Sequence, residues 1–120
     1  MILADTSVWV SHLRQGHPDL IALLNQSEIL CHPLVMGELA CGNLHNRKMI
    51  LSLLEALPTA KSATHAEVLQ FIDARKLMGR GIGYVDAHLL ASALLSPCLI
   101  WTQDKKLAAL ATKLHCAYTA

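Results

Sequence analysis

Aromatic residues are scarce in this sequence: they make up 4% of its 120 residues, although 53% of the residues are hydrophobic. Leucine, isoleucine, valine and alanine must therefore form most of the core, which is typical of helices packed on a parallel sheet. The composition favours an α/β fold over a β-sandwich. Because a chain of this length buries one full core, we expect a single domain over residues 1–120.

Neither sign of charge is in excess, since the formal net charge is +1. A nucleic-acid-binding surface would therefore need a local cluster of basic side chains. The four cysteines form no C-x-x-C pair, which argues against a zinc ribbon or a disulfide framework and predicts buried free thiols. The short spacings of Cys41 with His45 and of His115 with Cys116 have no matching second half, so we assign no zinc site.

No hydrophobic run is both long enough and free enough of polar residues to span a bilayer. The most apolar region, 85–101, is interrupted by Asp86, His88, Ser92, Ser96 and Pro97. The first residues enter an apolar segment directly, without a basic leader or a cleavage site of small residues. We therefore expect a soluble, cytoplasmic protein with no membrane partner.

Short apolar segments alternate with segments of helical periodicity. Strands are predicted over 2–4, 28–31 and 98–102, with weaker candidates at 59–63 and 117–119. Helices are predicted over 7–14, 18–25, 33–41, 47–57, 65–78, 85–95 and 105–114. Such alternation indicates parallel strands joined by helical crossovers, an arrangement in which ligands bind outside the carboxyl ends of the strands.

Four acidic residues stand where an apolar segment meets a turn or a helix: Asp5, Glu38, Asp86 and Asp104. Asp86 and Asp104 could simply cap helices, and Glu38 could face solvent. Asp5 fits such an interpretation less well, because it follows a buried strand, where an unpaired charge is costly. Clustered carboxylates repel one another unless a cation neutralises them, and hard oxygen ligands suit Mg²⁺ or Mn²⁺. Such a site can activate water for attack on a phosphodiester.

Four segments of the sequence resemble the motifs of the PIN-domain family, and within it those of VapC-type toxins. They are Ile2-Leu-Ala-Asp5-Thr-Ser-Val-Trp9, Gly37-Glu38-Leu39, Gly83-Tyr-Val-Asp86-Ala-His-Leu-Leu-Ala-Ser92 and Thr102-Gln-Asp104. The resemblance covers almost the whole chain. It implies a three-layer α/β/α sandwich with a central, mostly parallel sheet, and Mg²⁺- or Mn²⁺-dependent endoribonuclease activity. It also implies a cognate antitoxin that blocks the active site, and a homodimer.

The resemblance further implies roles for individual residues. The metal would be held, directly or through water, by Asp5, Glu38, Asp86 and Asp104. The acidic residues or their waters would be ordered by the hydroxyls of Thr6, Ser7 and Thr102, of which Thr102 belongs with the catalytic set. Some relatives carry a further acidic residue near the last motif, where this chain has Gln103 and Lys105, so the number of metal ions, one or two, stays open.

Basic side chains near these motifs could form a rim for RNA phosphates: Arg75, Lys76, Arg80, Lys105 and Lys106. Arg80 and Lys105 are the candidates for direct RNA contact, although charge runs more often only solvate a face. The glycine-rich loop 79–83 follows a helix rather than a strand, which is the wrong context for a dinucleotide site. Trp9 could stack on a base, but its place on the first helix favours packing.

Two other functions remain open at the level of sequence. An aspartyl-phosphate phosphatase would use Asp5 as its nucleophile, but position 7 is Ser rather than a second acid. A catalytically inactive PIN-like module would bind RNA or protein through its surface alone, and the intact acidic set argues against it. Which RNA would be cut depends on surface shape that the sequence does not display.

Overall fold

The sheet at the centre of the computed structural model is built from three parallel strands. The structure describes residues 1–119, so Ala120, the last residue of the expected domain, lies outside the described residues. The strands are β1 (Ile2–Ala4), β2 (Ile29–Leu30) and β3 (Leu99–Trp101), in the order β2-β1-β3. Leu3 of β1 lies opposite Leu30 on one side and Ile100 on the other. The predicted α/β class with a parallel sheet is confirmed.

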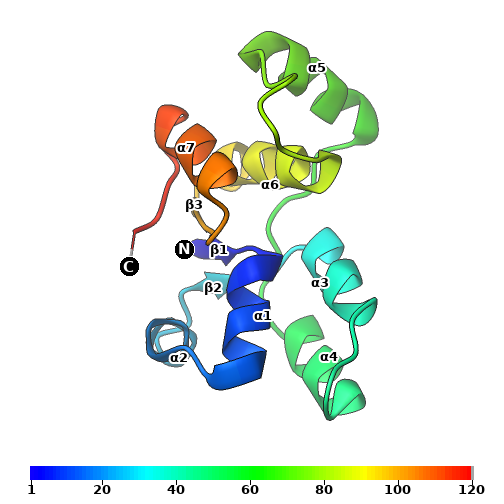
Figure 1. The fold of residues 1–120 in the computed structure, drawn as a ribbon, viewed down its shortest axis with the longest axis vertical. Coiled ribbons are helices and arrows are strands. Elements are labelled where there is room, and N and C mark those ends of the chain that lie inside the picture. Colours follow the sequence, from blue (N-terminus) through cyan, green and yellow to red (C-terminus); the bar gives the residue numbers. More distant parts are fainter. Residues whose placement is uncertain (120) are drawn as a thin grey trace.

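Helices cover both faces of this sheet (Figure 1). On one side lie α1 (Thr6–Gln15), α2 (Pro18–Asn25), α3 (Pro33–Ala40) and α4 (Arg47–Glu55). On the other side lie α5 (His65–Arg75), α6 (Tyr84–Leu95) and α7 (Lys105–Lys113). Helices α6 and α7 contact β3, whereas α5 packs on α6. The result is the three-layer α/β/α sandwich that the resemblance implied.

The core is mainly aliphatic, as the scarcity of aromatic residues predicted. Its largest fully buried apolar side chains include Leu3, Leu20, Ile29, Leu89, Leu90, Ile100 and Leu107. All four cysteines are free thiols; Cys31, Cys98 and Cys116 are buried as expected, whereas Cys41 is exposed, so the prediction was wrong there. In the described part of the chain, no helix combines the length and the apolar character that crossing a membrane requires.

The two weak strand predictions are reduced to single bridging residues. Thr59 pairs with Cys31 beyond the end of β2, and Ala117 pairs with Ile100 beside β3. At the first of these edges the Cys31 N–H donates to the carbonyl of Pro58, and the Ala60 N–H donates to the carbonyl of Cys31. The chain then leaves the sheet to enter the capping box of α5 at Thr64, so the expected strand over 59–63 is not formed.

Helix α5 ends three residues earlier than predicted. Lys76 adopts a left-handed conformation with φ of 53°, and the Leu77 N–H donates to the carbonyl of Ile72 in the manner of a Schellman motif. Leu77 is thereby turned into the core, where its side chain is 4% exposed. The apolar periodicity at this residue reflects burial after the helix has ended, and not a continuing helix.

Candidate active site

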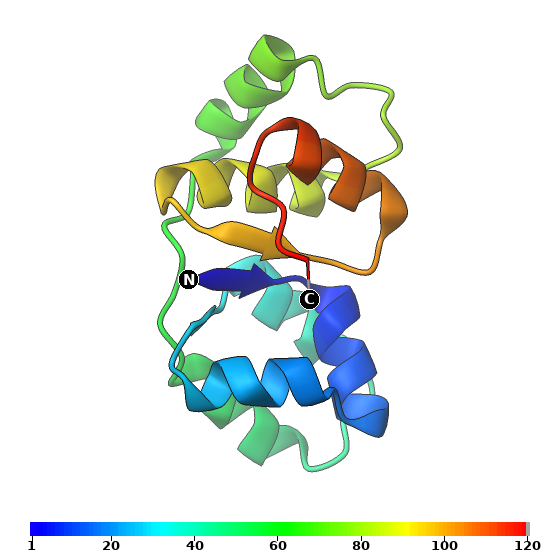
Figure 2. The ribbon, with the colours of Figure 1, turned by 90° about the vertical axis from the view of Figure 1, so that its left-hand side faces the viewer.

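The carboxyl ends of the parallel strands and the beginnings of three helices lie at one end of the molecule. Figure 2 shows β1 running directly into α1, with the first turns of α6 and α7 at the same end. Ala4 lies opposite Trp101 in the register, so the next residues along the two strands, Asp5 and Thr102, are neighbours at this edge. The Asp5 N–H continues the ladder by donating to the carbonyl of Trp101, 3.0 Å away.

Asp5 is a buried carboxylate, 5% exposed, that is held by three donors. Its Oδ1 accepts hydrogen bonds from the Ser7 hydroxyl at 2.6 Å and from the Val8 N–H at 3.2 Å, which caps α1. Its Oδ2 accepts a hydrogen bond from the Thr102 hydroxyl. Neutral donors thus orient the carboxylate, but no basic side chain forms an ion pair with it within residues 1–119. Its negative charge therefore stays available to a cation.

Thr102 and Asp104 form the second part of this edge. The Asp104 N–H donates to the Thr102 hydroxyl oxygen at 3.0 Å, so one hydroxyl joins both acidic residues. Oδ1 of Asp104 caps α7 by accepting from the N–H groups of Lys106 and Leu107, at 2.8 and 3.0 Å. The capping interpretation of Asp104 is therefore correct for one oxygen, and the side chain is exposed at the start of α7.

Glu38 approaches from α3 and is exposed to solvent, the alternative that the sequence left open. Its Oε1 accepts a hydrogen bond of 2.5 Å from the hydroxyl of Thr6, the first residue of α1. Each of the three hydroxyls predicted to order acidic residues thus bonds to one of them: Thr6 to Glu38, and Ser7 and Thr102 to Asp5.

Asp86 enters the site from the first turn of α6 and is partly buried. Its Oδ2 accepts a hydrogen bond from the N–H of Gly83 at 3.3 Å, so Asp86 caps its helix as well. Burial raises the pKa of this carboxyl, and the negative charges of Asp104, Asp5 and Glu38 raise it further, in that order of strength. Asp104, Asp5 and Glu38 are therefore close enough to act on the charge of Asp86, although the four carboxylates come from four different elements.

The loop before α6 is packed against the start of α7. Gly81 has φ of +79°, and a Cβ placed on it would lie 2.6 Å from Cδ of Lys106. The positive φ favours glycine here, whereas the lysine side chain is flexible and could move away from a larger residue. The glycine-rich loop thus brings the helix that carries Asp86 beside the helix that Asp104 caps.

The donor set suits a hard divalent cation, since it consists of carboxylate and hydroxyl oxygens. Within residues 1–119, however, no three or more His, Cys, Asp and Glu side chains converge closely enough to hold one ion as they stand. The carboxylates face a common region without closing on one point. Burial is the main cause of the raised pKa of Asp86, and repulsion by the other three carboxylates, which a cation would relieve, adds to it.

Asp86→Asn should stabilise the metal-free protein. A raised pKa means that the ionised carboxyl is less favourable in the folded than in the unfolded state, so removing the charge removes a cost at neutral pH. We expect the free energy of unfolding to rise by about 0.5–2 kcal/mol in urea titrations with chelator present. Asp73, an exposed carboxyl outside the cluster, serves as the control, and equal effects of Asp86→Asn and Asp73→Asn would contradict the raised pKa of Asp86.

The five basic residues proposed as a rim are all exposed: Arg75, Lys76, Arg80, Lys105 and Lys106. In the described part of the chain, no lysine or arginine forms a salt bridge with an acidic side chain. Their charges are therefore not neutralised by the protein itself.

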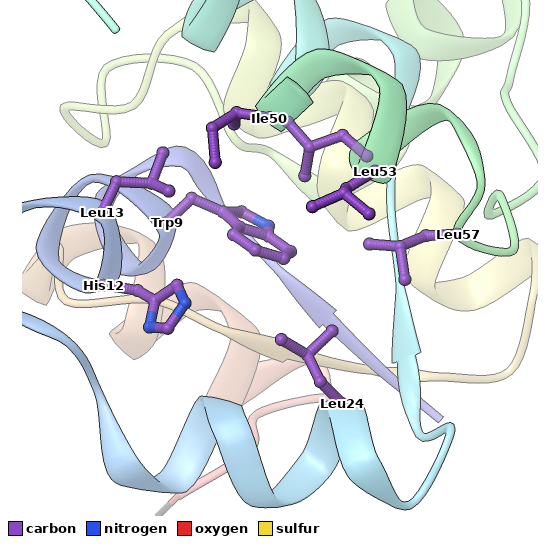
Figure 3. A pocket seen from close by; sticks show the side chains of 8 residues that line it. Trp9, His12, Leu13, Leu24, Ile50, Leu53 and Leu57 are labelled. Carbon is purple, nitrogen blue, oxygen red and sulfur yellow. The ribbon is translucent and has the colours of Figure 1, made fainter. Parts of the chain in front are cut away.

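Trp9 packs away from the carboxylates, as its position on the first helix favoured. It is 4% exposed and lines an apolar cavity of about 250 Å³ between α1, α2 and α4 (Figure 3). The other lining residues are His12, Leu13, Leu24, Ile50, Leu53, Leu54 and Leu57. None of the four carboxylates borders this cavity, so Trp9 is not placed to stack on a base at the site.

No role was predicted for His32, yet it is 1% exposed and hydrogen-bonded through both ring nitrogens. Nδ1 accepts from the Leu34 N–H at 3.0 Å, and Nε2 lies 3.0 Å from the hydroxyl oxygen of Ser92. Because Nδ1 accepts, the ring is neutral and Nε2 carries the proton, which it donates to Ser92. Burial, with a smaller effect of His88, lowers the pKa of His32 to about 4. One sequence signal could have identified His32 as a helix cap. It stands between an apolar strand and Pro33, which is the position of an N-cap residue.

Folding stability should therefore decrease as the pH falls from about 6.5 to about 4. Between these two pH values the unfolded chain binds a proton at His32 and the folded chain does not. The contribution of the neutral His32 to folding stability is therefore fully present above pH 6.5 and is lost as the pH falls towards 4. The loss from His32 reaches about 3 kcal/mol at the lower end. Urea unfolding of wild type and His32→Asn measures it: their stability difference should shrink as the pH falls, and a constant difference would contradict the prediction.

The fold and site define an α/β protein with an acidic cluster at the carboxyl edge of a parallel sheet, and three comparisons place it more closely. The PIN-domain family model matches residues 2–113. Ribonuclease VapC32 from Mycobacterium tuberculosis, strains CDC 1551/Oshkosh and ATCC 25618/H37Rv, is 49% identical over 110 residues, which is 91% of this chain and 89% of that protein. The crystal structure of PAE2754 from Pyrobaculum aerophilum has a TM-score of 0.60 at 18% identity, covering 95% of this chain and 88% of that one.

The chain belongs to the PIN-domain family, and its resemblance to the VapC type within that family is confirmed. The likeness to PAE2754 supports the fold alone, because the identity is low.

Proposed function

We propose that this chain is a Mg²⁺- or Mn²⁺-dependent endoribonuclease toxin that hydrolyses RNA phosphodiester bonds and is neutralised by a cognate antitoxin. The observation that carries the proposal is the environment of Asp5. It is a buried carboxylate oriented by Ser7 and Thr102, at an edge where Asp104, Asp5 and Glu38 add to the effect of burial in raising the pKa of Asp86. The name of the 49% identical relative, a ribonuclease, supports the same activity here.

The ion would be held by Asp5, Glu38, Asp86 and Asp104, directly or through water. When bound, such an ion lowers the pKa of water and stabilises negative charge on phosphate oxygens. The protein contributes preorganisation: the Thr102 hydroxyl fixes Oδ2 of Asp5, and the Ser7 hydroxyl fixes Oδ1 while accepting the N–H of Gln103 at 2.9 Å. Asp5 is therefore held in one orientation before an ion or a substrate arrives.

RNA would reach the acidic edge along basic side chains. Arg80 lies in the loop that leads to Asp86, and Lys105 follows Asp104 directly. Both are exposed and free of salt bridges within residues 1–119, so they can neutralise phosphates of a bound RNA. Affinity for RNA should accordingly fall as the salt concentration rises.

The VapC type of the chain supports a proposal about its protein partners. We propose that a small antitoxin protein binds over the acidic edge in the cytoplasm and blocks access of RNA to it, and that the toxin itself is a homodimer. Light scattering of the purified chain measures its mass directly. A monomer at all concentrations would refute the dimer without affecting the proposed activity.

RNA cleavage by the purified protein, mapped with Mg²⁺, with Mn²⁺ and with chelator, tests the activity. We expect discrete cuts with either metal and none with chelator. Cleavage that is insensitive to chelator would refute metal dependence. RNA binding without cleavage under every condition would instead identify an inactive binding module, and a trapped phosphoryl group on Asp5 would identify a phosphatase.

A further inference from the structure

The buried hydrogen bond between His32 and Ser92 joins two elements that each deliver a carboxylate to the site. His32 is the N-cap of α3, the helix that carries Glu38, and Ser92 lies on α6, the helix that carries Asp86. The two bonded side chains are 1% and 0% exposed, and they are 60 residues apart in sequence. A bond of this kind fixes one helix against the other at a single point.

The His32–Ser92 bond lies at a similar distance along each helix from the carboxylate that the helix carries. Glu38 lies six residues after His32 and Asp86 lies six residues before Ser92, so each carboxylate is about 9 Å along its helix axis from the bond. Over that length a small change in the angle between the helices moves the carboxylates relative to each other by an appreciable fraction of an ångström. Metal and phosphate sites tolerate little such misplacement.

The chemistry of the pair suits a permanent link. The imidazole is held in one tautomer because the Leu34 N–H occupies Nδ1, which leaves the Nε2 proton for Ser92 alone. Both groups are buried, so water does not replace the bond if one partner is removed. A second imidazole, that of His88, lies on α6 one turn before Ser92, with its centroid 6.3 Å from that of His32.

We propose that His32 and Ser92 are positioning residues of the nuclease site: their hydrogen bond sets the separation of Glu38 on α3 from Asp86 on α6. The inference rests on the proposed metal-dependent activity. It assigns a function to two buried residues that touch neither the metal nor the substrate. Groups that hydrogen-bond directly to metal ligands contribute about 10- to 100-fold in metal affinity or activity, and we expect this more distant pair to act at the lower end of that range.

Three substitutions distinguish the hydrogen bond between His32 and Ser92 from the capping of α3 by His32. Ser92→Ala removes the acceptor, and His32→Asn keeps an acceptor for the Leu34 N–H while losing the reach to Ser92. His32→Gln does the reverse, because its amide nitrogen can donate to Ser92 but its side chain no longer caps α3. Ser52→Ala, at an exposed serine on α4, is the matched control.

The experiment is calorimetric titration of Mn²⁺ into each full-length protein, together with RNA cleavage at saturating Mn²⁺. Each protein is measured at a fixed interval below its own melting temperature, so that loss of folding does not mimic loss of affinity. We expect Ser92→Ala and His32→Asn to weaken Mn²⁺ binding by about tenfold or more, with no further loss in the double variant. We expect His32→Gln and Ser52→Ala to stay within about threefold of wild type.

Mn²⁺ affinity that is unchanged in folded Ser92→Ala and His32→Asn would overturn the proposal. If Ser92→Ala does not fold, His32→Asn decides, because its cap is retained. A wild type that binds no Mn²⁺ would refute the proposed metal-dependent function itself. If wild type binds Mn²⁺ normally but the losses of affinity in Ser92→Ala and His32→Asn add up in the variant that carries both, the two residues act separately. That result would overturn the proposed role of their hydrogen bond and leave the proposed function standing.

Discussion

Asp5→Asn should reduce metal-dependent RNA cleavage by roughly a thousandfold or more, since several kcal/mol of transition-state stabilisation depend on a correctly held ion. Asn is nearly isosteric, and its side-chain oxygen can still accept from the Val8 N–H that caps α1. The fold should therefore persist. What is lost is a buried negative charge at the point where β1 ends. Single-turnover cleavage with saturating Mg²⁺ measures the effect.

Asp19→Asn is the matched control for this substitution. Asp19 is also in the first turn of a helix, α2, but it is exposed and belongs to no acidic cluster. It should leave the cleavage rate within about twofold of wild type, as surface substitutions away from functional sites usually do. Full activity of Asp5→Asn, in a preparation with a wild-type melting curve, would exclude the assignment of Asp5. Binding of the antitoxin should be the same in both variants.

Thr102→Val should lower cleavage by about 10- to 100-fold, which is the usual contribution of groups that orient metal ligands. The hydroxyl of Thr102 donates to Oδ2 of Asp5 and accepts the N–H of Asp104, so valine removes one support from each of the two acidic residues. Thr102→Ser retains the hydroxyl and should recover most of the activity. The apparent Mg²⁺ affinity, obtained from the metal dependence of the rate, should change in parallel.

The control for Thr102→Val lies on the exposed face of α7. The hydroxyl of Thr112 donates only to the carbonyl of Ala108 in its own helix, at 2.9 Å. Thr112→Val should therefore leave the rate and the metal dependence unchanged. If Thr102→Val were equally harmless, the hydroxyl between Asp5 and Asp104 would have no part in positioning the site.

Most of the fold could be predicted because apolar periodicity and turn residues agree with it along the chain. The three main strands and the seven helices occur where their patterns indicated, with ends displaced by up to three residues. Errors arose where strand pairing depends on residues far away in the sequence. Whether residues 59–63 form a strand depends on their pairing with the chain at Cys31, and the residues around Thr59 carry no sign of that pairing. The end of α5 was predicted too late for a related reason: Leu77 is buried, but it lies after the end of the helix.

The acidic residues could be selected because each stands at the end of a buried element, and the register then makes Asp5 and Thr102 neighbours. The sequence left open whether Glu38 faces solvent, and it could not show that α3 exposes this side chain and places it where the Thr6 hydroxyl donates a hydrogen bond to it. The link between His32 and Ser92 was missed for a physical reason. It joins helices on opposite faces of the sheet, and no local pattern records such a contact.

Anomalous diffraction from crystals grown with Mn²⁺ locates the ion without reference to activity, and so decides whether the four carboxylates form a metal site. We predict a manganese peak at the carboxyl edge of the sheet, with Asp5 and at least two of Glu38, Asp86 and Asp104 as ligands or as partners of its bound waters. A manganese-containing crystal with no peak at these side chains would contradict the account, as would a peak on another face of the molecule.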